Sequence, residues 1–229
     1  MIEIRDVYKR FGRKKVLDGV SFTIKPNEVT CITGINGTGK TTLMNSIMRL
    51  MPIDKGHIML DNQPITNNDF EKVAYIADSL TVPISMTIKE AMEFMSIYYE
   101  RWNQKKANEL LTFFRLNPED KLKNLSKGSQ AKANFLLGLA QDADYYLMDE
   151  PFSGVDVFAR EQILDVFTSQ FVDGKGVLIA THHIDEIEVL VDRIVMLQAG
   201  KIERDFYAED MRENEGKAII DVMREVYQG

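Results

Sequence analysis

Apolar and polar residues alternate along the first thirty positions with the period of two that is typical of β-strands. The alternation is clearest in 2–7, IEIRDV, and in 20–24, VSFTI. Pro26 and Asn27 then interrupt the pattern, as residues that favour turns do. The segment therefore predicts an antiparallel β part at the N-terminal end.

A short apolar run at 29–33, VTCIT, leads into a glycine-rich segment at 34–39, and a helical pattern follows over 42–48. Pro52 ends this helical pattern, because its ring removes a backbone donor and clashes with the preceding turn. Two more short strands are predicted at 56–63 and 73–76.

The middle third of the chain has a helical pattern. Residues 87–114 contain many long side chains and no glycine or proline, and a second helical pattern covers 127–141. We therefore predict a single domain in which a helical subdomain at 85–143 is inserted into an α/β core lobe formed by 1–84 and 144–229.

Short apolar strands alternate with helices after this insertion. The strands are predicted at 145–148, 177–180 and 194–197, and the helices at 158–171 and 185–190. Such alternation is typical of a mostly parallel sheet that helices cover on both faces, so the predicted fold class is α/β.

The last segment with a clear pattern is 217–227, which carries Ile219, Val222, Met223 and Val226 at helical spacing. We predict that this amphipathic helix packs onto the body of the protein, and a surface for a partner is the alternative.

Composition narrows the class of protein. The 229 residues are 45% hydrophobic, enough for one large domain, and no apolar run approaches the roughly 18 residues that a membrane span requires. Early charges argue against a signal peptide, and the single cysteine, Cys31, is predicted to be a buried core residue in a reducing compartment. A net charge of −7 argues against nucleic acid as a ligand.

The octet that begins at Gly34, GINGTGKT, matches the phosphate-binding pattern G-x-x-x-x-G-K-[ST] at every fixed position. Gly34, Gly37 and Gly39 allow backbone conformations in which successive N–H groups turn inward and cradle phosphate oxygens. Lys40 places a cation beside the β and γ phosphates, and the Thr41 hydroxyl can ligate Mg²⁺. Because a predicted strand precedes the octet and a helix follows it, the segment predicts a nucleotide phosphate site.

Two acidic residues, Asp149 and Glu150, end the apolar strand YYLM more than a hundred residues later. Ligands of open parallel sheets bind at the carboxyl ends of the strands. Asp149 suits Mg²⁺, directly or through water, and Glu150 can polarise a water for attack on the γ phosphate. The alternative is that the two acids merely end a strand. The presence of a phosphate-loop motif in the same chain disfavours this alternative.

Beyond these two motifs, the chain resembles the ATP-binding subunits of ABC transporters along nearly its whole length. Residues 125–130, LSKGSQ, resemble that family's signature, LSGGQ, and residues 153–156, SGVD, resemble its D-loop. Thr181 and His182 resemble the switch histidine motif, and Phe11 lies where the family places an aromatic ring against adenine. The resemblance implies a P-loop NTPase of ABC type, with two lobes, a head-to-tail dimer and ATP hydrolysis coupled to a membrane partner.

The same resemblance implies roles for individual residues. Glu150 is the expected general base and His182 the expected γ-phosphate switch, while Thr41, Asp78 and Asp149 are the expected ligands of Mg²⁺. ATP and Mg²⁺ are the expected cofactors. The residues expected to contact ATP within one subunit are Phe11, Val16, Gly34, Asn36, Gly37, Thr38, Gly39, Lys40, Thr41 and Thr42.

A second subunit is expected to close the site. Ser126 is a good N-cap for the helix that follows, so its hydroxyl and the first N–H groups of the helix point to one spot. A helix N-terminus has partial positive charge and binds anions. In the family this end, here Ser126, Gly128 and Ser129, meets the γ phosphate held by the opposite subunit. The alternative is a plain helix cap.

Two departures from the family pattern concern the signature and the Q-loop. The signature usually has Gly at the position of Lys127 and Gln at that of Ser129, and Asp78 replaces the usual glutamine of the Q-loop. A carboxylate can hold Mg²⁺ through water, but when ionised it cannot donate a hydrogen bond as glutamine does. Similar substitutions occur in family members that serve drug- or peptide-exporting permeases, so the resemblance favours an exporter.

We therefore predict a cytoplasmic ATPase subunit, peripheral on the inner face of the cell membrane, that forms a homodimer or heterodimer and serves an integral membrane permease. The segment after Asp78 is rich in Met and aromatic residues and is the expected permease surface; the alternative is that these residues form the subdomain's own core.

Two rival classes remain. The first is a soluble ABC-type ATPase that acts as a clamp in repair or translation. It is less favoured than a transporter subunit, because the chain has one predicted domain and no long heptad run. A regulatory protein that binds ATP without turnover is disfavoured by Glu150 and His182.

Overall fold

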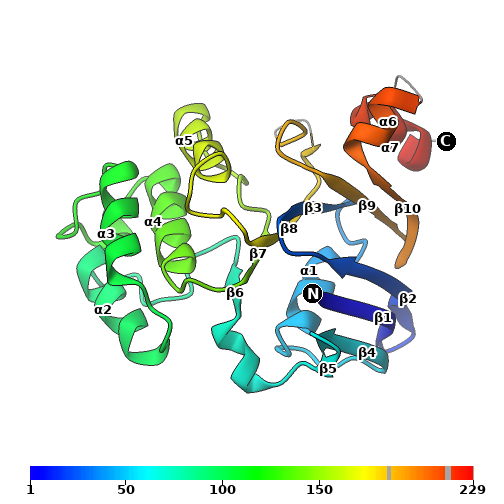
Figure 1. The fold of residues 1–229 in the computed structure, drawn as a ribbon, viewed down its shortest axis with the longest axis horizontal. Coiled ribbons are helices and arrows are strands. Elements are labelled where there is room, and N and C mark those ends of the chain that lie inside the picture. Colours follow the sequence, from blue (N-terminus) through cyan, green and yellow to red (C-terminus); the bar gives the residue numbers. More distant parts are fainter. Residues whose placement is uncertain (185–186, 215–217, 229) are drawn as a thin grey trace. The chain divides into compact units, whose positions relative to one another are not determined.

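The computed structural model describes residues 1–184, 187–214 and 218–228. The chain forms two compact units, whose elements are labelled in Figure 1. Met1–Phe70 and Gly176–Gly229 form the first, which we call the P-loop unit because it contains the glycine-rich octet. Glu71–Lys175 form the second, which we call the helical unit.

The N-terminal part of the P-loop unit is an antiparallel sheet, as the alternation predicts. Its strands follow the order β2-β1-β4-β5. Ile2 pairs with Ile24 and Ile4 pairs with Phe22, and these four side chains are buried on one face. The strands are β1 (Ile2–Phe11), β2 (Lys14–Ile24), β4 (Lys55–Leu60) and β5 (Gln63–Pro64).

The parallel part of the same unit is centred on β3 (Glu28–Thr33). This strand pairs in parallel with β8 (Gly176–Thr181) on one side and β9 (Arg193–Gln198) on the other, while β10 (Lys201–Tyr207) adds an antiparallel edge to β9. Nearly every residue of β3, β8 and β9 is buried, which is why they read as continuous apolar runs. Cys31 is buried in β3, as predicted.

The helices of the P-loop unit are α1 (Lys40–Ile47), α6 (Ala208–Asn214) and α7 (Ile219–Gln228). The helix α7 corresponds to the predicted amphipathic segment 217–227, and Ile219 and Val222 are fully buried, so it packs onto the body. A helix is also predicted at 185–190, of which 185–186 lie outside the described part of the chain. Residues 187–190 form a turn instead of a helix.

The helical unit contains a parallel strand pair, β6 (Val73–Ile76) and β7 (Tyr145–Asp149). It therefore combines the predicted helical segment 85–143 with two strands and the helix that follows β7. Its helices are α2 (Ile88–Tyr98), α3 (Gln104–Phe113), α4 (Lys127–Leu139) and α5 (Val157–Phe167). A short 3-10 helix of this unit covers Leu122–Asn124, and another, Asn67–Glu71, spans the boundary between the two units in the sequence.

The segment 87–114 forms two helices rather than one continuous helical pattern. The first begins at a capping box, in which the Thr87 hydroxyl accepts from the Glu90 N–H and the Glu90 carboxylate accepts from the Thr87 N–H. The second begins where the Asn103 side chain accepts from the Lys106 N–H. Between them, Tyr99 is extended, so the chain leaves the helix without any glycine or proline.

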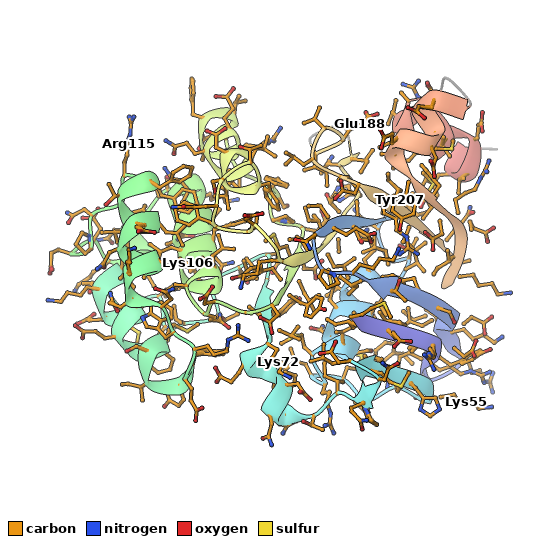
Figure 2. The ribbon with its side chains drawn as sticks, in the orientation of Figure 1. Lys55, Lys72, Lys106, Arg115, Glu188 and Tyr207 are labelled. Atoms are coloured by element: carbon orange, nitrogen blue, oxygen red, sulfur yellow. The ribbon has the colours of Figure 1, made fainter. Side chains whose placement is uncertain are left out.

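The core of the helical unit includes a polar network beside its apolar contacts. Lys106, labelled in Figure 2, donates to the Asp142 carboxylate at 3.2 Å and to the Tyr146 hydroxyl at 3.2 Å. The Tyr146 hydroxyl donates in turn to the Leu139 carbonyl oxygen at 3.1 Å. A buried ammonium is stable only with such partners, so this network ties α3 to the start of β7.

None of the helices in the described residues combines the length and the hydropathy that a transmembrane span requires.

Candidate functional site

The phosphate loop joins β3 to α1 in the P-loop unit, and its glycines are needed for different reasons. Gly37 has φ +83° and Gly39 has φ +114°, which side-chain-bearing residues rarely adopt. Gly34 lies against β9, where an added Cβ would overlap the carbonyl oxygen of Leu197. All three glycines of the octet therefore stand where a side chain would cause backbone strain or a clash.

The cation of the loop is Lys40, the first residue of α1. Its side chain is only 6% exposed, and its Nζ donates to the Gly34 carbonyl oxygen at 2.7 Å. Because Gly39 is the N-cap, no side chain caps the first N–H groups of α1. The Thr38 hydroxyl closes the loop by donating to the Ile35 carbonyl oxygen at 3.0 Å.

This donor set fits the phosphate chain of a nucleotide. Uncapped N–H groups at a helix N-terminus, together with an ammonium, form an anion site of the kind that phosphates occupy. Asn36 and Thr41 are exposed beside the loop, and Thr42 is half-buried in α1.

The predicted contacts to the base also belong to the P-loop unit. Phe11 ends β1 with its side chain 49% exposed, and Lys9 Nζ lies 5.6 Å from the centre of its ring. The carbonyl oxygen of Val16 would lie 2.8 Å from a Cβ added to Gly39, so β2 packs directly against the phosphate loop. An exposed aromatic ring on the same sheet gives a base a surface for stacking.

His182 follows β8 in the P-loop unit. Its predecessor Thr181 is the register partner of Thr33, the residue before the phosphate loop. The half-buried His182 therefore lies at the same carboxyl edge of the sheet as the loop. Its ring centre is 3.8 Å from that of His183, whose N–H donates to the Thr181 hydroxyl at 3.1 Å.

Asp149 is the last residue of β7 in the helical unit, and it is 4% exposed. The hydroxyl of Tyr75, on the neighbouring strand β6, donates to Asp149 Oδ2 at 3.3 Å. Burial and the Asp149 carboxylate raise the pKa of Tyr75 well above its usual value, so the hydroxyl keeps its proton. Sequence reasoning missed Tyr75, because a tyrosine in a short apolar strand is typical of a core.

Glu150 has φ +44°, in the left-handed region. Such a conformation is uncommon for a residue with a side chain and is a form of backbone strain that gathers at functional sites.

The signature segment begins α4 in the helical unit. The Ser126 hydroxyl accepts from the Ser129 N–H at 3.1 Å, which is the predicted N-cap. A Cβ added to Gly128 would lie 2.5 Å from Asp156 Oδ2 and 2.7 Å from the Ala159 Cβ. Gly128 therefore allows α4 to pack against the first turn of α5, which Asp156 caps.

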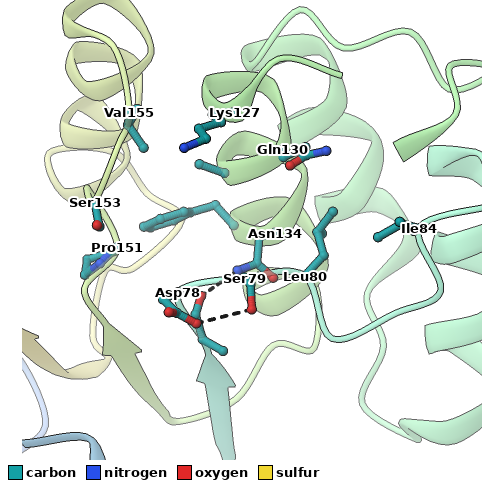
Figure 3. Close-up of a pocket in the computed structure, with 13 residues that line it drawn as sticks. Asp78, Ser79, Leu80, Ile84, Lys127, Gln130, Asn134, Pro151, Ser153 and Val155 are labelled. Carbon is teal, nitrogen blue, oxygen red and sulfur yellow. Dashed lines mark hydrogen bonds between the residues drawn. The ribbon is translucent and has the colours of Figure 1, made fainter. Parts of the chain in front are cut away.

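The two departures from the family pattern, Asp78 and Lys127, line one pocket of the helical unit (Figure 3). The pocket has a volume of about 320 Å³. On one side of it, Ser79 donates to Asp78 Oδ1 at 3.2 Å. On the other, Lys127 Nζ would lie 3.8 Å from a Cβ added to Gly154, so the Lys127 side chain extends toward the D-loop.

The predicted site residues thus fall into two groups. The P-loop unit holds the phosphate loop, Phe11, Val16 and His182, and the helical unit holds Asp78, Asp149, Glu150 and the signature segment. In the P-loop unit, the loop and His182 lie at the carboxyl edge of the parallel sheet, and Val16 of the antiparallel sheet packs against the loop. In the helical unit, the predicted residues lie around the ends of β6 and β7 and the start of α4.

A parallel sheet with a glycine-rich loop before a helix, and a buried strand that ends in two acids, define the class of P-loop nucleotide-binding proteins. The family model described as ABC transporter matches residues 17–153. The chain belongs to this family, as a nucleotide-binding domain of an ABC transporter.

Curated relatives include both importers and exporters. The chain is 32% identical to the petrobactin import ATP-binding protein YclP of Bacillus subtilis, over 99% of this chain and 92% of that protein. It is 31% identical to the Nod factor export ATP-binding protein I of Burkholderia lata, over 87% of this chain and 68% of that protein. ATP-binding subunits of this family in general bind and hydrolyse ATP, form dimers and work with membrane permeases.

Solved structures agree on the fold. An ATP-binding subunit of an ABC transporter superposes with a TM-score of 0.88 at 24% identity, covering 99% of both chains. A nucleotide-free ATP-binding cassette from an ABC transporter gives 0.80 at 24% identity, over 97% of this chain and 98% of that one. The predicted P-loop NTPase fold of ABC type is confirmed.

Proposed function

We propose that this protein is the ATP-hydrolysing subunit of an ABC transporter and powers substrate movement through a membrane permease. The observation that carries the proposal is the phosphate loop, in which the buried Lys40 at the start of α1 donates to the Gly34 carbonyl oxygen and glycine supplies the positive φ of residues 37 and 39. Family membership supports the same activity.

In the P-loop unit, the backbone N–H groups of the loop and Lys40 would bind the β and γ phosphates. Phe11 would stack on the adenine ring and Val16 would contact the nucleotide from β2. The Thr41 hydroxyl would hold Mg²⁺, which supplies charge neutralisation on the phosphates when bound.

In the helical unit, Asp149 is the proposed carboxylate ligand of Mg²⁺ and Glu150 the proposed general base. Tyr75 holds the Asp149 carboxylate by donating to Oδ2, which fixes its orientation. Asp78 would contribute to the Mg²⁺ site through water. His182, at the carboxyl edge of the sheet in the other unit, would contact the γ phosphate.

A second subunit would complete the site through the start of α4, where Ser126, Gly128 and Ser129 would face the γ phosphate in trans. The close approach of α4 to α5 at Gly128 supports this, because it holds the signature segment and the D-loop together as one surface. The dimer would be a homodimer or a heterodimer on the inner face of the cell membrane.

The permease would contact exposed apolar side chains of the helical unit. Met92 and Met95 are buried and belong to the unit's own core. Ile84, Ile97 and Tyr98 are exposed by 57%, 78% and 66%, so they remain available to a partner. Isolated exposed apolar residues are common, but Ile97 and Tyr98 are neighbours at the end of α2, and adjacent exposed apolar residues favour an interaction surface.

We also propose export as the direction of transport. The proposal is supported by Asp78 and Lys127, which depart from the family pattern and line the same pocket. Purification of the intact transporter tests it. An exporter is expected to purify as ATPase and permease alone, and an extracellular substrate-binding protein in the complex would contradict export.

Two substitutions test ATP binding and hydrolysis separately. Lys40→Ala is expected to weaken ATP binding, since it removes the cation of the loop. Glu150→Gln is expected to keep ATP binding, to lower hydrolysis by at least about a hundredfold as loss of a general base does, and to trap an ATP-bound dimer. Lys55→Ala, at the start of β4 (Figure 2), is the matched control and is expected to change neither.

The measurements are binding of a fluorescent ATP analogue, phosphate release and light scattering with and without ATP. Unchanged affinity in Lys40→Ala would contradict the loop assignment, and wild-type hydrolysis in Glu150→Gln would contradict the assignment of the base.

A further inference from the structure

The C-terminal helix α7 reaches the start of the phosphate loop through a single hydroxyl group. Tyr227 donates to the carbonyl oxygen of Thr33 at 3.0 Å, and its hydroxyl lies 3.4 Å from the carbonyl oxygen of Leu197. Thr33 is the last residue of β3 and directly precedes Gly34. One side chain therefore contacts both strands that flank the entry to the loop.

The same place is where the loop packs most closely on the sheet. Gly34 lies so near the Leu197 carbonyl oxygen that a Cβ would overlap it. The Tyr227 hydroxyl, the Gly34 backbone and the carbonyl groups of Thr33 and Leu197 thus meet at one junction. A shift of the β3 carboxyl end would move Gly34 and the N–H groups that follow it.

The helix that carries Tyr227 is itself anchored. Ile219 and Val222 are fully buried, and the Ile219 N–H donates to Glu188 Oε1 at 3.1 Å. Burial raises the pKa of Tyr227 well above its usual value, so its hydroxyl remains a hydrogen-bond donor at neutral pH. The contact is therefore a fixed feature of the P-loop unit.

We propose that Tyr227 is a positioning residue for ATP binding, whose hydroxyl fixes the carboxyl end of β3 and so the first turn of the phosphate loop. The proposal rests on the proposed binding of ATP by this loop. A loop that is already ordered loses less conformational freedom when the phosphates bind. Loss of the hydroxyl should therefore weaken ATP binding, with a smaller effect on turnover once ATP is bound.

Tyr227→Phe isolates the hydroxyl, because it keeps the ring and its packing. The chain offers a matched control in Tyr207, which is labelled in Figure 2. The Tyr207 hydroxyl donates to Glu28 Oε2 at 3.0 Å and accepts from Lys25 Nζ at 2.5 Å. Glu28 is the first residue of β3, so Tyr207→Phe removes a hydroxyl from the opposite end of the same strand.

Three readouts are compared: the Kd for Mg-ATP, the KM and kcat of ATP hydrolysis, and amide hydrogen exchange of 34–42 without nucleotide. Tyr227→Phe is expected to raise Kd and KM about three- to tenfold, as loss of one hydrogen bond does, to leave kcat within about twofold, and to speed exchange in the loop. Tyr207→Phe is expected to leave Kd and loop exchange near wild type.

The proposal is overturned if Tyr227→Phe binds ATP and exchanges as the wild type does, or if both variants weaken ATP binding equally. Failure of the proposed function has a different signature. In that case the wild type itself does not bind Mg-ATP, whatever the exchange of the loop.

Discussion

Individual glycines of the phosphate loop meet different physical demands, although the sequence motif treats them alike. Gly37 has positive φ but open space around its Cα, with no atom within 4 Å of an added Cβ. Gly34 has no positive φ, but the backbone of Leu197 occupies the place of its Cβ. One position therefore needs conformational freedom and the other needs room.

This difference predicts that alanine at position 34 destabilises the protein more than alanine at position 37. Gly34→Ala would force β3 and β9 apart, because a backbone carbonyl cannot move aside as a flexible side chain does. Gly37→Ala would incur only the strain of positive φ, about 1–2 kcal/mol. Urea unfolding of the nucleotide-free proteins should show the larger loss in Gly34→Ala, and equal losses would contradict the packing argument.

Glu150 carries a backbone strain that its proposed role as general base would explain. Its φ of +44° favours glycine, yet glycine could not fill that role. We expect Glu150→Gly to have a free energy of unfolding about 1 kcal/mol higher than Glu150→Ala, because only the glycine variant relieves the left-handed conformation. Both variants lack the side chain beyond Cβ, so the comparison isolates the backbone. Denaturant titration measures it, and a less stable glycine variant would mean that Glu150 is not strained.

Secondary-structure elements were predictable where a strong periodicity coincided with a cap. The helix predicted at 127–141 is α4, whose Ser126 cap is visible in the sequence. The segment 87–114 was harder, because Asn103 caps α3 inside a run without glycine or proline. The break there depends on tertiary contacts, among them the Arg101 N–H donating to Glu71 Oε2 at 3.1 Å, which no local pattern contains.

The candidate site shows the same limit. The phosphate loop and the two acids after β7 could be predicted because their residue types are close together in the chain. The contacts of Tyr75 with Asp149 and of Tyr227 with the Thr33 backbone join residues far apart in sequence. A tyrosine on an apolar segment is typical of a core, so only the fold reveals the partner of its hydroxyl.

The connection between α2 and α3 provides a prediction of pH dependence. Arg101 donates to both carboxylate oxygens of Asp144, at 3.0 and 2.7 Å, and this holds the pKa of Asp144 below its usual value. The pKa of Asp144 in the unfolded chain is about 3.9, so its lower pKa in the folded protein stabilises the fold at pH values above about 3.9. This stability is lost as the pH falls through the pKa that Asp144 has in the folded protein. The pair is partly exposed, so we expect about 0.2–1 kcal/mol.

The destabilisation caused by Asp144→Asn should therefore be largest near neutral pH and shrink below about pH 4. Urea unfolding at pH 7, 5 and 3 measures it. In an Arg101→Met background the same substitution should lose most of this pH dependence, because only the weaker effects of Lys175 and Lys72 on the pKa of Asp144 remain. An undiminished dependence there would show that Arg101 is not its main cause.

At the scale of the whole molecule, the proposed role requires a surface for a permease outside the buried core. In the helical unit, the methionines of α2 face inward and Ile97 and Tyr98 face outward, with the Tyr98 ring centre 4.8 Å from that of Phe94. The last turn of α2 is thus an ordered apolar surface. A substitution on this surface should therefore weaken binding of the proposed permease without changing the nucleotide site.

Ile97→Asp tests this at the scale of the assembly. The side chain is 78% exposed, so a charge there should leave folding, ATP affinity and basal hydrolysis close to wild type. Binding to the permease should fall at least tenfold, because the charge would have to be buried without a partner. Val189→Asp is the control, since Val189 is 84% exposed but belongs to the P-loop unit. Co-purification of the transporter from membranes, with thermal unfolding of each variant in parallel, measures both effects. If Ile97→Asp and Val189→Asp retain the permease equally, the surface at the end of α2 is not the docking site.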